Sequence, residues 1–317
     1  MQGDMKRMNY EWENKFEWDS LKSKRILIAG GTGFIGKRLV CFLEKHKIGA
    51  YVITRQKLAD TEYVKYLNAD LSDIEQLTRL GENVFFDILI YMAANIPLSG
   101  EKKESYFDAS QSTLMPFINF CTAYVKNRCK LIYISSVDVL GAYEEFEFNE
   151  EALPNIATPY GLAKYCGEFY AKNICTKENA DCLILRFAQV YGPDEPIVRI
   201  IPIIRNAILN GKRFELWTDG NEKRRFLYVD DAVQAIICGI NSSERGIFNI
   251  AGSEVISMAE LVALMEKSFE TELNYSILNK IHGTDNVPSI KKAVEKLNFA
   301  PEILLENGMS IIRGNLK

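Results

Sequence analysis

Short apolar segments alternate with longer segments of helical periodicity from Arg25 onward. This alternation is typical of a parallel sheet whose strands are buried on both faces by crossover helices. We expect strands at residues 25–29, 50–54, 86–91, 130–135 and 181–187. We expect helices at residues 34–47, in a region that ends near residue 128, and at about residues 157–176. The pattern therefore predicts an α/β fold with a doubly wound parallel sheet.

The chain changes character after the strand expected at 181–187. Pro193, Pro196 and Pro202 interrupt it, and its helical and extended pieces become shorter. At roughly 150 residues per domain, 317 residues suffice for about two units. We therefore expect one domain over residues 25–190 and a smaller C-terminal α/β lobe mainly over residues 191–317, between which the chain can cross.

Residues 1–24 precede the first expected strand. They mix charged residues with Trp12, Phe16 and Trp18 and contain no apolar core segment. We expect an N-terminal arm whose tryptophans pack on the body of the protein or on a partner subunit. The segment does not resemble a signal peptide.

Charge and hydrophobicity exclude several classes of protein. The 38 basic and 42 acidic residues give a net charge of −4, so no global basic field favours nucleic acid. The chain is 47% hydrophobic and 25% charged, as in ordinary globular proteins. No segment reaches the roughly 18 apolar residues of a membrane span. We expect a cytoplasmic protein that binds neither nucleic acid nor membranes.

Cysteine and histidine give no sign of a metal site. The seven cysteines are scattered and form no CxxC pair, which favours buried, reduced thiols. His46 and His282 are the only histidines, too few for a histidine-rich metal site and far from any recognisable nucleophile turn of a hydrolase. We expect no metal.

A glycine-rich turn follows the first expected strand and opens the first expected helix. Gly30, Gly33 and Gly36 form a GxxGxxG pattern that includes Phe34 and Ile35. Missing side chains permit a tight turn and let the backbone approach a pyrophosphate, which the N–H groups and the dipole of the helix hold. An ordinary strand-to-helix turn needs only one such glycine. The pattern therefore predicts a Rossmann-type dinucleotide site.

The second expected strand ends in Thr54 and Arg55, roughly 20 residues beyond the glycines. Domains that prefer NAD usually carry a carboxylate there for the ribose hydroxyls. Arg55 instead suits a 2′-phosphate through its planar guanidinium, so NADP(H) is favoured and NAD(H) stays possible. The alternative is a solvated surface arginine.

Tyr160 and Lys164 lie four residues apart in one expected helix and therefore on one face. A neighbouring ammonium favours the phenolate of a tyrosine, whose ordinary pKa is about 10. Ser135 and Ser136 end the preceding strand, at the sheet edge where chemistry gathers in open parallel sheets. Such a hydroxyl can donate to a substrate oxygen during hydride transfer, although a serine pair is also a common turn or helix cap.

Six ordered motifs together carry a resemblance. They are Gly30 to Gly36, Asp70-Leu71, Ala93-Ala94, Ser135-Ser136 with Gly141, Tyr160 to Lys164, and Tyr191-Gly192-Pro193. Between about Lys24 and Arg313 the chain resembles the extended short-chain dehydrogenase/reductases. The branch that it resembles most contains the nucleotide-sugar epimerases, dehydratases and reductases.

The resemblance implies roles around the cofactor and the reacting carbon. Asp70 and Leu71 would border the adenine, and Ala93 and Ala94 would line the cofactor trough. Lys164 would also hold the nicotinamide ribose, Tyr160 would be the acid/base, and Ser136 would assist at the sugar oxygen.

The resemblance also implies substrate contacts. Arg224 would clamp the substrate pyrophosphate, a task that suits a bidentate guanidinium. Gln189 falls where these enzymes often place an asparagine near the sugar nucleotide, in a segment that Arg186 begins. A buried structural polar pair explains Gln189 and Arg186 equally well.

Three departures from the family pattern concern the reaction. Dehydratases of this branch carry a Thr-Asp-Glu run where this chain has Ser136-Val137-Asp138, so the pair of groups that would eliminate water is incomplete. Asp138 is a lone acid near the sugar or a surface turn residue. Arg225 replaces a usual aspartate, and Ala109 stands where an asparagine is common.

We therefore expect an enzyme that oxidises or reduces a ring carbon, the carbon at position 4, of a nucleotide-linked hexose. Arg55 favours net reduction of a 4-keto-6-deoxy sugar by NADPH. The alternative is a 4-epimerase that retains NAD, and an alternative of another class is a non-catalytic dinucleotide sensor. The resemblance further implies a homodimer paired through helices that include residues 160–176. The nucleotide base and the sugar stereochemistry depend on loops and cannot be read from the sequence.

Overall fold

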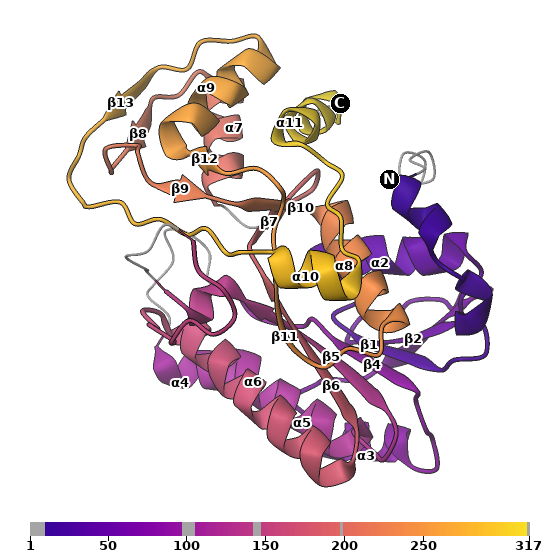
Figure 1. Cartoon of the computed structure of the whole chain (residues 1–317). Coiled ribbons are helices and arrows are strands. Elements are labelled where there is room, and N and C mark those ends of the chain that lie inside the picture. Colours follow the sequence, from indigo (N-terminus) through magenta and orange to yellow (C-terminus); the bar gives the residue numbers. More distant parts are fainter. Residues whose placement is uncertain (1–9, 97–104, 142–146, 197–198, 316–317) are drawn as a thin grey trace.

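The computed structural model describes residues 10–96, 105–141, 147–196 and 199–315. Its centre is a seven-stranded sheet in the order β11-β6-β5-β4-β1-β2-β3, with every neighbouring pair parallel (Figure 1). The strands are β1 (Ile26–Ala29), β2 (Ala50–Thr54), β3 (Val64–Asn68), β4 (Ile88–Tyr91), β5 (Lys130–Ser136), β6 (Asp181–Phe187) and β11 (Gly246–Ile250). The strand order reverses on the two sides of β1, which is where ligands bind in open α/β sheets.

Helices cover both faces of this sheet. One face carries α2 (Phe34–Lys45), α8 (Val229–Asn241) and α10 (Lys291–Leu297), and the other carries α3 (Ile74–Gly81), α5 (Met115–Tyr124) and α6 (Pro159–Glu178). The two faces follow from the alternation of side chains along a strand. In β1, Ile26 and Ile28 join one hydrophobic cluster, and Leu27 and Ala29 join the other. The predicted doubly wound α/β fold is confirmed.

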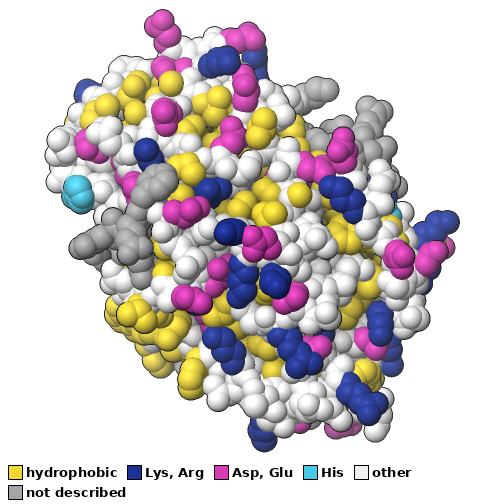
Figure 2. All heavy atoms as spheres, viewed as in Figure 1, with side chains coloured by type: hydrophobic (Ala, Val, Ile, Leu, Met, Phe, Trp, Pro, Cys, Tyr) yellow, Lys and Arg dark blue, Asp and Glu magenta, His cyan; other side chains and the backbone are white. Residues whose placement is uncertain are grey.

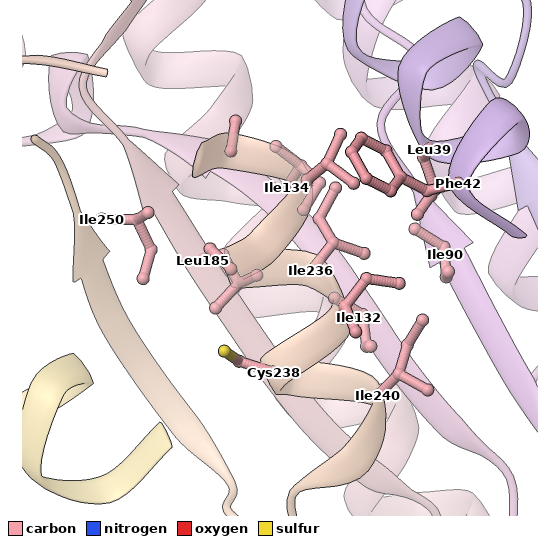
Figure 3. Packing of buried hydrophobic residues seen from close by; sticks show 14 of the residues in the cluster. Leu39, Phe42, Ile90, Ile132, Ile134, Leu185, Ile236, Cys238, Ile240 and Ile250 are labelled. Atoms are coloured by element: carbon pink, nitrogen blue, oxygen red, sulfur yellow. The ribbon is translucent and has the colours of Figure 1, made fainter. Parts of the chain in front are cut away.

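The first cluster lies between the sheet and helices α2 and α8. In Figure 3, Ile90, Ile132 and Leu185 of three strands face Ile236 and Ile240 of α8. All five side chains are almost completely buried. Because close packing of this kind leaves little freedom, the cluster fixes α8 on the sheet.

A smaller lobe lies beyond the carboxyl edge of the sheet (Figure 1). It contains β7 (Gln189–Tyr191), α7 (Ile200–Asn210), β8 (Phe214–Leu216), β9 (Lys223–Arg224), β10 (Phe226–Tyr228), β12 (Ile256–Ser257), α9 (Met258–Phe269), β13 (Tyr275–Ile277) and α11 (Leu305–Gly314). Three two-stranded ladders, β10-β7, β12-β9 and β13-β8, pack with the helices around a separate hydrophobic cluster.

The chain crosses between these two regions. After β10 in the smaller lobe, the chain returns to the large sheet as α8. It then adds β11 at the edge of that sheet, beside β6. The sequence pattern alone did not identify Gly246–Ile250 as a strand of that sheet. The domain boundary at residue 191 stays a prediction.

Element ends differ from the sequence expectations by a few residues. The helix expected to reach residue 47 ends at Lys45, because Lys47 adopts a left-handed φ of 58° and the amide of Ile48 donates to the carbonyl of Leu43. Helix α6 begins at Pro159 because the hydroxyl of Thr158 accepts from the amide of Gly161.

The short elements complete the chain. They are 3-10 turns at Glu11–Lys15, Trp18–Leu21 and Val137–Val139, helix α4 (Tyr106–Ala109) and a π-helical turn at Ser110–Leu114. All seven cysteines are free thiols. Among the residues described above, no helix combines the length and apolar character that crossing a membrane requires, and no cluster of metal-ligating side chains forms.

The described part of the N-terminal arm, residues 10–24, packs on the body of its own chain. Trp12 is 1% exposed and lies against Phe42 of α2, with ring centroids 5.2 Å apart. The phenol of Tyr10 donates to the carboxylate of Asp230 in α8, and the ring of Trp18 stacks on His46 at 3.7 Å. The arm therefore joins α2 and α8 from outside.

Candidate active site

The glycine turn lies at the end of β1, beside the reversal of strand order. Gly30 has a φ of +90°, and a Cβ there would lie 2.7 Å from the amide nitrogen of Ala93. A Cβ at Gly36 would lie 2.1 Å from the carbonyl oxygen of Gly30. Only glycine fits either position. The glycine turn leads directly into the first turn of α2, which begins at Phe34 after Gly33. Together, the two turns form a cradle of backbone N–H groups that fits the pyrophosphate of a dinucleotide.

The other residues expected at the cofactor lie along the same carboxyl edge. Arg55 is exposed after β2, Asp70 and Leu71 follow β3, and Ala93 and Ala94 follow β4. The carboxylate of Asp70 accepts from the amide and hydroxyl of Ser72, which lowers its pKa, and the charge of Arg55 contributes to the same shift. Arg55 and Asp70 therefore lie close enough to interact electrostatically.

A π-helical turn borders the expected cofactor trough. Thr113 in this turn exchanges two hydrogen bonds of 3.3 Å with the backbone of Asn95, directly after Ala94. Ala109, which stands where relatives often have asparagine, is buried at the end of α4 immediately before the turn. Such turns are frequent at functional sites.

Tyr160 and Lys164 share the first part of α6. Lys164 is 2% exposed, its Nζ donates to the carbonyl of Ile134 at 2.8 Å, and it lies 5.8 Å from the centre of the Tyr160 ring. Burial lowers the pKa of Lys164 to about 7, against the opposing effect of Glu168. An ammonium held beside a tyrosine ring can favour its phenolate.

Ser136 and Tyr160 lie on segments that touch each other. Ser136 ends β5, and its hydroxyl accepts from the amide of Asp138 at 3.1 Å. A Cβ at Gly161 would lie 2.6 Å from the carbonyl oxygen of Asp138, so the serine turn packs directly on the first turn of α6. Asp138 itself is half-buried in this turn.

Two of the expected substrate residues lie in the smaller lobe. Arg224 is half-buried in β9, and its guanidinium has no hydrogen bond or ion pair with the described part of the chain. Gln189 begins β7, and its buried Nε2 likewise finds no partner among the residues placed in the structure. Polar groups buried without partners suit a polar ligand.

Arg225 and Arg186 have structural partners instead. Arg225 donates to the carbonyls of Gly252 and Ser253 and to the carboxylate of Glu147, and thereby ties the smaller lobe to the segment that follows the serine turn. Arg186 forms a buried ion pair with Glu168 of α6. Of the two readings left open for Arg186, the structure favours a structural pair, although its partner is Glu168 and not Gln189.

The sequence reading missed Glu168 and Glu195. Glu168 follows Lys164 by one helical turn, and this spacing was a usable signal. Glu195 lies three residues after Gly192, is 7% exposed, and finds no hydrogen-bond partner for either carboxylate oxygen within the described residues. Burial raises its pKa to about 8, against the charges of Arg199 and Arg205. No local pattern distinguished it.

Comparison with known proteins agrees with this geometry. A model of the NAD dependent epimerase/dehydratase family matches residues 26–251, from β1 to the residue after β11. The chain belongs to this family.

Two relatives, named as a reductase and as a putative epimerase, match most of the chain. The dTDP-4-dehydro-6-deoxyglucose reductase of Escherichia coli is 27% identical over 301 residues, 90% of this chain and 95% of the relative. A putative UDP-glucose 4-epimerase of Methanocaldococcus jannaschii is 28% identical over 90% of this chain and 95% of its own. This chain is an enzyme of the extended short-chain dehydrogenase/reductase type, among nucleotide-sugar epimerases, dehydratases and reductases.

Solved structures of family members share the fold. The UDP-glucose 4-epimerase of Thermotoga maritima, solved with UDP-glucose, superposes with a TM-score of 0.80 at 23% identity and covers 92% of this chain and 98% of its own. The UDP-glucuronic acid 4-epimerase of Bacillus cereus, solved with NAD, gives a TM-score of 0.79 at 21% identity, with 92% and 96% covered. The family depends on nicotinamide dinucleotides, and the cradle at Gly30 and Gly36 fits this cofactor.

Proposed function

We propose that this enzyme reduces the keto group at position 4 of a nucleotide-linked 6-deoxyhexose with NADPH. The observation that carries the proposal is the exposed Arg55 at the end of β2, where retained NAD would favour a carboxylate. The match to a reductase over nine-tenths of the chain supports it.

The residues of α6 and β5 account for the chemistry. Bound NADPH would supply a hydride to the carbonyl carbon of the sugar. Tyr160 gives its hydroxyl proton to the carbonyl oxygen, so the ketone becomes an alcohol and the tyrosine becomes a phenolate that solvent reprotonates. Lys164 stabilises that phenolate with its ammonium group and would also hold the nicotinamide ribose of the bound cofactor. Ser136 donates a hydrogen bond to the same sugar oxygen.

The smaller lobe holds the nucleotide part of the substrate. Arg224 has its guanidinium unpaired among the described residues and pairs with the substrate pyrophosphate. Gln189 offers an unpartnered amide Nε2 close to the junction of the two regions, where β7 pairs with β10. Asp138 lies on the serine turn and faces the sugar as a lone acid.

Dehydration is not the proposed reaction. Val137 stands between Ser136 and Asp138, and its side chain is buried, with 4% of its surface exposed. A valine offers no acid or base, so this chain lacks one of the two carboxylates that a dehydratase of this family uses.

A 4-epimerase that retains NAD is the second candidate. The observation that favours it is the group of structural neighbours, which include 4-epimerases solved with NAD. In that reaction Tyr160 would remove the proton from the sugar hydroxyl group. It would return the proton after the keto sugar has rotated to present its other face. The two candidates share every residue of the site except Arg55.

An assay with a nucleotide-linked 4-keto-6-deoxyhexose tests the proposal. The wild-type enzyme should oxidise NADPH in stoichiometric amounts with formation of the alcohol. Tyr160→Phe should lower kcat about 10²- to 10⁴-fold and leave NADPH binding intact, because only the proton donor is lost. Tyr170→Phe, on the same helix with its hydroxyl 3.3 Å from Thr122, is the matched control. Equal turnover of Tyr160→Phe and the control would overturn the role of Tyr160, and binding without turnover of any substrate would favour the sensor.

A homodimer completes the proposal. Five hydrophobic side chains remain exposed on α4, α5 and α6, namely Tyr106, Phe107, Met115, Leu162 and Phe169. Figure 2 shows a hydrophobic patch at the lower left, in the area that α4 and the start of α6 occupy in Figure 1. Exposed patches of this kind mark interaction sites, and a second copy of the chain would cover this one.

A further inference from the structure

A buried network of hydrogen bonds ties α6 to β5 and β6, one helical turn beyond the proposed catalytic residue Lys164. One carboxylate oxygen of Glu168 accepts from the hydroxyl of Ser135 at 2.6 Å and from Nε of Arg186 at 2.8 Å. The other accepts from Nη2 of Arg186 at 2.7 Å. The side chains of Glu168 and Arg186 are 2% and 3% exposed, and Ser135 is the register partner of Arg186. The carboxylate is therefore fixed from two adjacent strands.

Such a pair is not explained by stability alone. Removing two charges from water costs several kcal/mol per ion, and apolar residues of the same volume often serve stability as well or better. The three hydrogen bonds recover part of that cost, but they also place one negative charge at a defined point of α6.

The position of Glu168 relates it to Lys164. The two residues are four apart in α6, and Tyr160 is four residues further back, so all three lie on one face of the helix. Two consecutive residues of β5 form hydrogen bonds with Lys164 and Glu168. The carbonyl of Ile134 accepts from Nζ of Lys164 at 2.8 Å, and the hydroxyl of the next residue, Ser135, holds Glu168.

The charges around Lys164 show what Glu168 does there. The rings of Tyr133 in β5 and Tyr160 in α6 lie 5.1 and 5.8 Å from its Nζ, and Arg186 of β6 is paired with Glu168. Burial lowers the pKa of Lys164 to about 7, and the charge of Glu168 acts in the opposite direction. Without that charge, the neutral amine would be favoured further at neutral pH.

We infer that Glu168 is a positioning residue for the Tyr160–Lys164 pair, which it serves by keeping Lys164 in its ammonium form and by fixing α6 against β5. The inference rests on the proposed roles of Tyr160 and Lys164. Glu168 contacts neither substrate nor cofactor in this account and acts only through Lys164. Arg186 and Ser135 hold the carboxylate in place.

The test measures the titration of Lys164 in the protein without substrate. Lysine labelled with ¹³C at Cε reports the charge of its own amine by NMR, and Lys164→Arg identifies the signal. The informative variant is Glu168→Gln, which removes the negative charge alone, because removing Arg186 as well would take away a positive charge that opposes it at Lys164. Where Glu168→Gln does not fold, Glu168→Gln/Arg186→Met replaces it, since that variant leaves no buried charge unpaired. Ser135→Ala is the matched control, since it removes one hydrogen bond and keeps the charge of Glu168.

In Glu168→Gln we expect the titration midpoint of Lys164 to fall by about one pH unit or more, and in the double variant by a smaller amount, while Ser135→Ala stays near the wild-type midpoint. The alkaline limb of the kcat profile should move to lower pH by a similar amount. Circular dichroism checks that each variant is folded. An unchanged midpoint in folded Glu168→Gln, or in the double variant where the single variant does not fold, would overturn the inference, and so would an equal fall in Ser135→Ala.

The failure of this inference and that of the proposed function are distinguishable. The NMR titration needs neither a substrate nor turnover, so it reports on Glu168 even if the enzyme does not reduce keto sugars. Conversely, a normal reductase assay with an unmoved Lys164 midpoint would leave the reaction in place and reject the role of Glu168.

Discussion

The helices on the two faces of the central sheet differ in how far the rest of the chain covers them. On the α2–α8 face, the N-terminal arm adds a further layer, in which Tyr10 and Trp12 pack with Phe42 and Phe16 packs against Trp12. On the α5–α6 face no such layer covers the helices in the described structure, and Phe107 and Phe169 are 71% and 68% exposed. The same sheet thus has one face closed by its own chain and one with aromatic side chains open to solvent.

The difference matches what each face holds. Helix α2 starts at the glycine turn, so the arm fixes the helix at which we propose that the dinucleotide pyrophosphate binds. Helix α6 carries Tyr160 and Lys164 on its buried face and Phe169 on its outer face. We interpret the covered face as the fixed support of the cofactor and the open face as the one that a second copy completes.

The largest expected effect concerns the covered face. Trp12→Ala removes a fully buried indole between Phe16 and Phe42 and should lower the free energy of unfolding by about 3–5 kcal/mol. Trp217→Ala is the control, because Trp217 is 55% exposed, and should change the free energy by less than about 0.5 kcal/mol. Chemical denaturation measures both. Similar small losses would mean that the arm does not support α2.

The second-largest expected effect concerns the open α5–α6 face and the association of two copies of the chain. Phe107→Ser/Phe169→Ser removes two aromatic contacts from the proposed interface and should weaken the dimer by about 2 kcal/mol or more, roughly 30-fold in Kd. Light scattering across a dilution series measures this. Leu209→Ser, on α7 of the other lobe and 51% exposed, should leave the association unchanged. A wild-type protein that is already monomeric would contradict the interpretation of this face.

A smaller effect is expected where the arm meets α8. Tyr10→Phe removes the hydroxyl that donates to Asp230, whose carboxylate is 2% exposed and 3.7 Å from Arg38. The loss of that donor should cost about 1–3 kcal/mol of folding free energy. Burial raises the pKa of Asp230 and the hydrogen bond from Tyr10 opposes that shift, so the loss should be larger at high pH, where the carboxylate is ionised, than at low pH, where it is protonated. A loss that is equal at both pH values would argue against this pairing.

Local chemistry made much of the fold predictable from the sequence. The buried strands read as apolar runs because both of their faces are covered, and the glycine turn is set by backbone contacts that Gly30 and Gly36 alone permit. Thr158 and Pro159 together announce the start of α6. For Tyr160 and Lys164, helical spacing was enough to place them on one face.

Features set by distant contacts were not predictable. Strand β11 joins the large sheet only through its pairing with β6, more than 60 residues earlier, and nothing in its own five residues indicates that register. The ion pair of Glu168 with Arg186 joins a helix to a strand, and the partner of a buried charge depends on tertiary packing. The arm is a similar case, since Trp12 finds Phe42 across the surface.

The central claim is net reduction by a dissociable NADPH, and the cofactor itself tests it most directly. Mass spectrometry and absorbance of the purified protein show whether a dinucleotide is retained, and titration with NADPH and NADH then gives both affinities. We predict an empty protein that binds NADPH much more tightly than NADH. That preference should be lost in Arg55→Ala and kept in Arg79→Ala, a surface arginine of α3 paired with Glu75. Tightly retained NAD that survives purification would contradict the reductase and point to the epimerase.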